Sequence, residues 1–436
     1  MMKIISRAPL FTLALTLATP SAWGAASAPS PRNTDESKVG SYVLPELLVT
    51  KDGRRITEPT LWRNVRRAEL LNDFATSTYG RTPLIPVKLR ARVLATKRDA
   101  VDGLATRTIV ELRFFDDPAA PKMTLMCYVP NAARGPAPAL LGLNYYGLAT
   151  VEPDPTLPLT DQWMRPTREL GIVNNRQTEA TRGSHASRWP LAVALRRGYA
   201  VATYYYGDLE PDHPDGWRDG LRGYLLKQQG RAKRAPDEWG AIGVWAWGLS
   251  RALDYLQTVP AIDGRRVAVF GHSRHGKTAL WAGAQDERFA AVISNDSGEG
   301  GAALGRRNFG ETIADSVRVN VFWYCDNYAT FAGRPEARPV DQHMLLALAA
   351  PRPLYVASAT LDLGADPRGE FLGAVNAAPA YALFGLAGLG TEVMPPPDTP
   401  IGQRIGYHVR TGPHDITAYD WAQFVAFLDR TLEAQH

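Results

Sequence analysis

The sequence predicts an α/β protein in which a mostly parallel central sheet is covered by helices on both faces. Segments typical of strands alternate with segments of helical spacing along most of the chain. Two strand segments, 137–143 and 199–205, are almost continuously apolar, as expected of strands buried on both faces. Residues able to do chemistry follow the strand segments, at the edge where sites form in parallel sheets.

The individual elements follow from local patterns. A strand is expected at 107–114, where apolar and polar residues alternate before an Asp-Asp-Pro turn. Further strands are expected at 123–129, 137–143, 199–205, 267–270, 289–294 and 353–359. Helices are expected at 189–196, 239–256, 277–284 and 419–432, of which 239–256 has the clearest helical spacing.

Composition places the chain among ordinary globular proteins. It has 436 residues, 45% of them hydrophobic, so it can bury a large core without a disulfide framework. Two cysteines, Cys127 and Cys325, exclude a Cys-rich metal site, and we expect two buried thiols. The net charge of +5 is mild and scattered, so we expect no nucleic-acid partner.

The N-terminus predicts export. Residues 1–24 have the features of a signal peptide: Lys3 and Arg7 precede an apolar run at 9–19 that is too short to span a bilayer. The alternative is an uncleaved anchor. We therefore expect a secreted or periplasmic monomer that is not in the membrane, with a disordered Ala/Ser/Pro-rich tail at 25–40 and a single catalytic domain at 41–436.

The strongest motif is GHSRHGK at 271–277, which places Ser273 between an expected strand and an expected helix. In α/β-hydrolases such a sharp turn exposes a nucleophilic serine and requires small residues close to it. Gly271 satisfies this requirement, whereas His275 stands where a second glycine is usual, with Gly276 next. The alternative is a serine that caps the following helix. We favour the nucleophile, and with it an α/β-hydrolase three-layer sandwich.

A nucleophilic serine needs a histidine as its base. In this fold the chain order is serine, acid, histidine. His414 lies in the loop before the closing helix, where the base belongs. His408 lies in a segment that alternates like a strand, so we expect it to be structural. His272 and His275 flank the serine and are expected to shape the turn.

The acid has two candidates at strand ends. Asp296 follows the strand expected at 289–294, and Asp362 follows the strand expected at 353–359. Asp362 has the more usual position, after the penultimate strand, but both stay open. Asp366 and Glu299 are weaker candidates.

Four segments together resemble the glucuronoyl esterases, carbohydrate esterase family 15. They are GHSRHGK at 271–277, NDSG at 295–298, RRNFGE at 306–311 and GPHD at 412–415, and the likeness extends from about Leu44 to the end. The resemblance implies an α/β-hydrolase without metal or other cofactor. Such an enzyme cleaves the ester between 4-O-methyl-glucuronic acid on xylan and an alcohol of lignin.

The resemblance also implies roles for single residues. It makes Ser273 the nucleophile and His414 the base, and it places the backbone N–H and guanidinium of Arg274 in the oxyanion hole. Lys277 and Glu311 resemble residues that bind sugar hydroxyls. The family places its acid at either of two strand ends, so Asp296 and Asp362 both remain candidates.

Two positions depart from the family pattern. His272 stands where many members have a cysteine that forms a disulfide, and Gly364 stands where many bacterial members have a tryptophan that contacts the sugar. The missing ring keeps open the alternative of an esterase for another carbohydrate ester, such as acetyl-xylan. A third alternative, from a different class, is an inactive hydrolase fold that binds polysaccharide.

Overall fold

One mixed sheet organises this protein, whose computed structural model describes residues 32–432. Its ten strands within that range lie in the order β1-β2-β3-β5-β4-β6-β7-β8-β10-β9. The strands from β5 to β10 pair in parallel, whereas β1, β2 and β3 pair antiparallel at one edge and β9 pairs antiparallel at the other. The predicted α/β architecture is confirmed.

The strands are β1 Arg90–Ala100, β2 Ala105–Arg113, β3 Lys122–Pro130, β4 Ala137–Asn144, β5 Ala200–Tyr205, β6 Ile262–His272, β7 Ala291–Asn295, β8 Leu354–Ala359, β9 Ile401–Gly402 and β10 Ile405–Arg410. The α-helices are α1 Pro59–Leu61, α2 Arg67–Ser77, α3 Leu191–Leu195, α4 Leu221–Gln228, α5 Ala241–Leu256, α6 Arg274–Gln285, α7 Ile313–Asn320, α8 Gln342–Ala347, α9 Pro367–Ala382 and α10 Ala418–Leu432. Every strand and helix expected from the sequence has a counterpart here. Helix α6 begins at Arg274, earlier than expected, because the chain enters it directly after Ser273.

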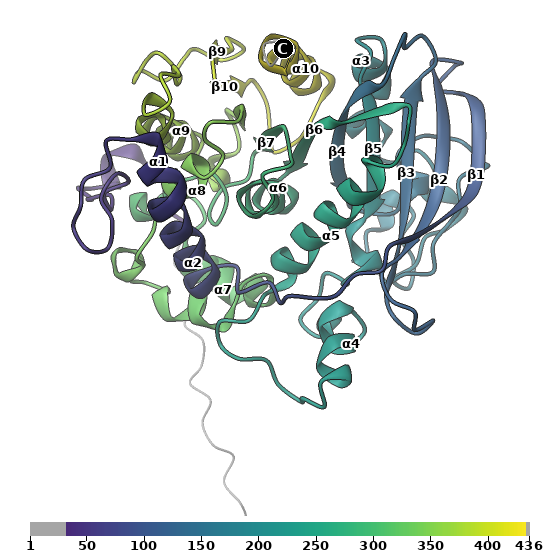
Figure 1. Ribbon diagram of the computed structural model, residues 1–436, viewed down its shortest axis with the longest axis horizontal. Coiled ribbons are helices and arrows are strands. Elements are labelled where there is room, and N and C mark those ends of the chain that lie inside the picture. Colours follow the sequence, from purple (N-terminus) through teal and green to yellow (C-terminus); the bar gives the residue numbers. More distant parts are fainter. Residues whose placement is uncertain (1–31, 433–436) are drawn as a thin grey trace, which may run out of the picture. The chain divides into compact units, whose positions relative to one another are not determined.

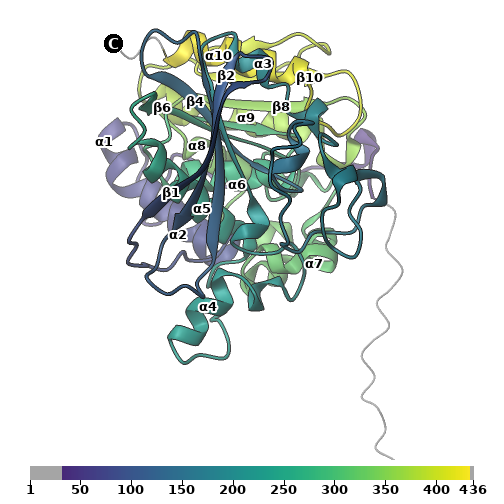
Figure 2. The ribbon, with the colours of Figure 1, turned by 90° about the vertical axis from the view of Figure 1, so that its right-hand side faces the viewer.

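Helices cover both faces of the sheet. The apolar residues of α3 and α10 pack on one face, and those of α2, α5, α6, α8 and α9 pack on the other (Figures 1 and 2). Strands β4, β5, β7 and β8 are buried along nearly their whole length between these two layers. Helices cover these strands on both sides, and this explains why their sequences are continuously apolar.

The segment 32–40 corrects part of the expected disordered tail. It includes a short 3₁₀ helix, Glu36–Lys38, capped by the side chain of Asp35. It is also tied to the rest of the chain, since Gly310 N–H donates to the carbonyl of Asn33 at 2.7 Å. These contacts could not be read from a Ser- and Pro-rich composition. The expected signal peptide at 1–24, and residues 25–31, lie outside the described residues.

Two further expectations concern the core and the membrane. Cys127 and Cys325 are buried free thiols, as predicted. Burial raises the pKa of Cys127 to about 12 and that of Cys325 to about 11, so both stay protonated. Among residues 32–432 no helix has the length and apolarity needed to cross a bilayer.

Candidate active site

Ser273 lies on a strained turn between β6 and α6. Its φ of 56° and ψ of −127° are unfavourable for any residue with a side chain, and the side chain is only partly buried. The turn is held by hydrogen bonds from Ser273 N–H to the carbonyl of Asn295, 2.8 Å, and from Gly276 N–H to the carbonyl of Ser273, 2.8 Å. This is the geometry of the predicted nucleophile turn.

The glycines around Ser273 are required by space. A Cβ at Gly271 would lie 2.0 Å from the carbonyl oxygen of His275, and one at Gly276 would lie 2.9 Å from the Cβ of Ser297. His275 fits because its ring points away and stacks on Tyr145, with centroids 4.0 Å apart. Burial lowers the pKa of His275 far below its usual value, which favours an uncharged ring whose role is to pack against its neighbours.

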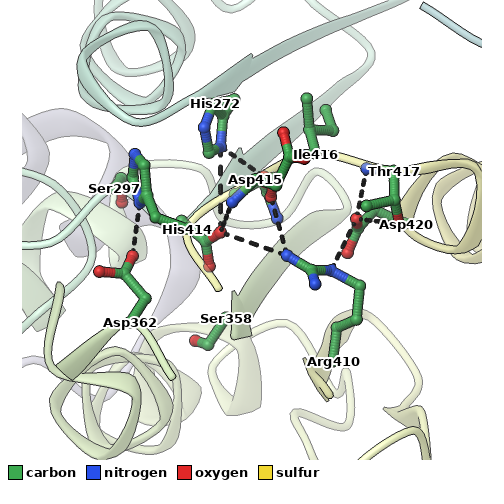
Figure 3. Close-up of polar contacts among 12 residues, drawn as sticks. His272, Ser297, Ser358, Asp362, Arg410, His414, Asp415, Ile416, Thr417 and Asp420 are labelled. Atoms are coloured by element: carbon green, nitrogen blue, oxygen red, sulfur yellow. Dashed lines mark hydrogen bonds and ion pairs between the residues drawn. The ribbon is translucent and has the colours of Figure 1, made fainter. Parts of the chain in front are cut away.

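His414 and Asp362 form a hydrogen-bonded pair next to this turn. The Nδ1 of His414 lies 2.5 Å from Oδ2 of Asp362 (Figure 3). The rings of His414 and His272 have centroids 4.4 Å apart, which places His414 beside the residue that precedes Ser273. A carboxylate on Nδ1 fixes the tautomer in which Nε2 can accept a proton. The pair can therefore act as base and orienting acid.

Asp296, the second candidate acid, lies close to this pair but is held by other groups. Its Oδ2 accepts from the N–H of Asp415 at 3.3 Å and lies 3.8 Å from a guanidinium nitrogen of Arg410. Its Oδ1 is buried and has no hydrogen-bond partner among the described residues. Burial, together with the nearby Glu370 and Asp362, raises the pKa of Asp296 well above its ordinary value. Asp296 is thus a buried neighbour of the pair rather than the partner of His414 Nδ1.

Arg410 and Asp420 brace this side of the site. Arg410 Nε donates to Asp420 at 3.1 Å (Figure 3). Asp420 also accepts from His408 Nε2 at 2.9 Å. His408 is fully buried in β10, in the structural role expected for it. The other two weak acid candidates are also structural: Asp366 caps α9 and binds Arg307, and Glu299 binds Tyr328.

Arg274 is positioned by residues that the sequence analysis did not identify. Its guanidinium is hydrogen-bonded to Asp212 and packs against the rings of Tyr145 and Trp323, 5.2 and 5.1 Å from their centroids. Asp212 is held in turn by Trp323 Nε1 at 2.7 Å. Burial opposes the charge of Arg274, but Asp212 and the tyrosines Tyr206, Tyr145 and Tyr146 together outweigh it, so the pKa is raised. The result is a fixed cation at the residue following Ser273.

Lys277 and Glu311 lie on another side of the turn. Lys277 is almost fully buried, and its Nζ donates to the carbonyls of Ser297 at 2.6 Å and Glu299 at 2.5 Å. Glu311 Oε2 lies 4.0 Å from the same Nζ. Burial lowers the pKa of Lys277, while Glu311 and Glu299 counteract that effect. One donor of the ammonium group thus stays available beside the Glu311 carboxylate.

One group of ionisable side chains within residues 32–432 has the spacing of a metal site. Asp296, Asp362 and His414 each offer one ligand atom, and these atoms lie within 4.8 Å of one another. The direct hydrogen bond between His414 and Asp362 leaves no space for a cation between them. The residues fit an acid–base pair better than a metal site, and the absence of a cofactor stays a prediction.

Comparison with known proteins agrees with this geometry. The family model for fungal glucuronyl esterases matches residues 232–385. The chain is 42% identical over 405 residues to carbohydrate esterase MZ0003 of an unknown prokaryotic organism, covering 92% of each protein. A solved glucuronoyl esterase from Solibacter usitatus superposes with a TM-score of 0.86 at 45% identity, covering 91% of this chain and 99% of that one. This chain belongs to carbohydrate esterase family 15, the glucuronoyl esterases.

A more distant relative extends the comparison to the fungi. The chain is 33% identical over 221 residues to 4-O-methyl-glucuronoyl methylesterase 1 of Phanerochaete chrysosporium, which is 47% of this chain and 45% of that protein. Together these matches identify the protein as a carboxylic ester hydrolase with glucuronoyl esterase activity.

Several residues that build this esterase site escaped the sequence analysis. Glu370 in α9 accepts from the N–H groups of Ser297 and Gly298, at 2.7 and 3.0 Å, and from the hydroxyl of Ser358 at 2.7 Å. It thereby fixes the loop after β7 that contains Asp296. Burial raises the pKa of Glu370 to about 8. A glutamate inside a helix, distant in sequence from its partners, offers no local signal for such a role.

Arg274→Ala is expected to lower kcat about 100- to 1,000-fold with little change in KM. The reason is that negative charge appears on the ester oxygen only as the tetrahedral intermediate forms. Steady-state kinetics on a glucuronate ester checks this. Arg165→Ala is a matched control, because Arg165 lies 3.9 Å from the same Asp212 but is exposed. A large rise in KM with kcat retained would show that Arg274 only holds substrate.

Proposed function

We propose that this esterase hydrolyses esters of 4-O-methyl-glucuronic acid, such as the links between xylan and lignin, through a serine acyl-enzyme. The observation that supports this most directly is the hydrogen-bonded His414–Asp362 pair beside the strained turn of Ser273. The presence of a candidate nucleophile, base and acid near one another supports an active hydrolase over an inactive polysaccharide-binding fold.

The proposed reaction has two stages, the acylation of Ser273 and the hydrolysis of the acyl-enzyme. His414 takes the proton of Ser273 as the serine oxygen attacks the ester carbonyl, and Asp362 stabilises the imidazolium that forms. Arg274, fixed by Asp212, stabilises the oxyanion. Collapse of the tetrahedral intermediate releases the alcohol, which receives the proton from His414. Water then attacks the acyl-enzyme by the same route and releases the uronic acid.

Recognition of the uronic acid is assigned to Lys277 and Glu311. An ammonium donor and a carboxylate acceptor 4.0 Å apart can bind hydroxyls of a sugar ring whose carboxyl carbon is at Ser273. An acetyl group has no such hydroxyls, which favours a glucuronate over an acetate as the acyl group.

Benzyl glucuronate is therefore expected to be cleaved with a kcat/KM about 100-fold or more above that for acetylated xylose. The physical reason is that an acetyl ester leaves Lys277 and Glu311 without partners in the acyl site. Measuring kcat/KM on both substrates with one enzyme preparation checks it. A preference for the acetylated sugar would support the other carbohydrate esterase instead.

Export is part of the proposal. The positive residues and short apolar run within residues 1–24 support cleavage of a leader and a secreted or periplasmic location. N-terminal sequencing of the protein from the growth medium and the periplasm checks this, and an intact N-terminus in the cell membrane would point to an uncleaved anchor.

A further inference from the structure

The segment 32–36 lies against the loop that contains Glu311 and close to the loop that contains Asp362 and Gly364. The carbonyl of Asn33 accepts from Gly310 N–H at 2.7 Å, next to Glu311 in the chain. Glu36 accepts from Arg307 Nη2 at 2.8 Å and lies 3.5 Å from Arg368. These contacts hold the segment, called here the N-terminal arm, at the loops that contain Glu311 and Asp362.

Arg32 extends from this arm toward Glu311. Its Nη2 lies 3.8 Å from Oε1 of Glu311, and its Nε lies 3.9 Å from Oδ2 of Asp315. Both distances allow charge attraction but exceed that of a hydrogen bond. Among the described residues the Arg32 guanidinium has no hydrogen-bond acceptor, and the side chain is 44% exposed. Its N–H donors are thus free for a ligand.

Gly364 shows where the guanidinium lies relative to the acid. A Cβ placed on Gly364 would lie 3.4 Å from Nη1 of Arg32 and 3.6 Å from Oδ1 of Asp362. Arg32 therefore fills the space in front of Gly364 that a side chain there would occupy. Since Asp362 borders the same point, this space adjoins the His414–Asp362 pair.

We propose that Arg32 is a specificity-determining residue that binds the uronic acid together with Glu311. A guanidinium donor and a carboxylate acceptor, held side by side but not bonded to each other, match two neighbouring hydroxyls of a pyranose. A sugar ring whose carboxyl carbon is at Ser273 and whose hydroxyls face Lys277 and Glu311 meets Arg32 next. The inference rests on the proposed glucuronate substrate.

Arg32→Ala is expected to raise KM for benzyl glucuronate about tenfold while kcat changes little. Hydrolysis of p-nitrophenyl acetate, which has no sugar, should stay unchanged because it uses only the turn, the base and the acid. Lys38→Ala is the matched control, since Lys38 lies just after the arm, is exposed, and among residues 32–432 its ammonium group pairs with Asp35 alone, at 3.3 Å. It should behave as the unchanged protein does on both substrates.

Two results would overturn the sugar-binding role of Arg32: an unchanged KM for benzyl glucuronate, or an equal loss of activity on both substrates. The substrate proposal is judged separately, by whether the unsubstituted protein prefers benzyl glucuronate. Thermal melting tests whether Arg32→Ala merely releases the N-terminal arm. The Tm values of Arg32→Ala and Lys38→Ala should agree. A lower Tm for Arg32→Ala alone would make the role of Arg32 structural.

A double-substitution cycle tests the shared space directly. Gly364→Leu should weaken binding of benzyl glucuronate when Arg32 is present, because the new side chain displaces the guanidinium. In the Arg32→Ala background the same change should have much less effect on KM. Simply additive effects would show that Arg32 does not occupy the space in front of Gly364, and would overturn the proposal.

Discussion

Ser273→Ala is expected to reduce ester hydrolysis about 10⁴-fold or more while the protein stays folded. Without the hydroxyl no acyl-enzyme forms, and the intact His414–Asp362 pair has no nucleophile to activate. Rates on benzyl glucuronate and labelling with a phosphonate probe check the result, and labelling should disappear with activity. A variant that keeps more than about a tenth of the rate would refute the assignment.

The strain at Ser273 supplies a control for this experiment. Alanine keeps the unfavourable φ of 56°, whereas glycine adopts it without a steric penalty. Ser273→Gly should therefore be as inactive as Ser273→Ala but melt at a higher temperature. If both variants melt alike, the turn is not strained, although the role of the serine hydroxyl would stand.

Asp362→Ala is expected to lower kcat about 10²- to 10⁴-fold, and Asp296→Ala is expected to lower kcat clearly less. Asp362 makes the direct hydrogen bond to His414 Nδ1, whereas Asp296 accepts from the N–H of Asp415 and its pKa is raised by burial and the nearby Glu370 and Asp362. The double substitution should lose more than the product of the single losses, because only then is His414 without any carboxylate. Kinetics of the three variants on one substrate measures this.

Asp296→Asn is the matched control, because the amide has nearly the shape of the carboxyl group but cannot act as a carboxylate. It should keep nearly full activity when Asp362 is present. If Asp296→Asn is instead as inactive as Ser273→Ala, Asp296 is the main acid. A double variant whose loss equals the product of the singles would mean that the two carboxylates do not serve one role.

Local sequence patterns predicted most of the sheet, and the exceptions have physical causes. Runs such as 137–143 are apolar because two helical layers cover β4, and that burial is visible in the sequence itself. Strand β1 was not expected because it is almost wholly exposed and forms by pairing with β2. Helix α9 was not expected either, since its glycines and Pro379 are unfavourable for a helix and tertiary packing maintains it.

Short motifs and the order of elements along the chain predict the turn around Ser273, the base His414 and both candidate acids. Only the packed structure shows that Asp362 bonds His414, that Asp212 and Trp323 position Arg274, and that Arg32 lies near Glu311. Those contacts join residues far apart in the chain. Their distances arise only when the loops after β5, β7, β8 and β10 and the segment that precedes β1 pack together, and no local periodicity encodes that packing.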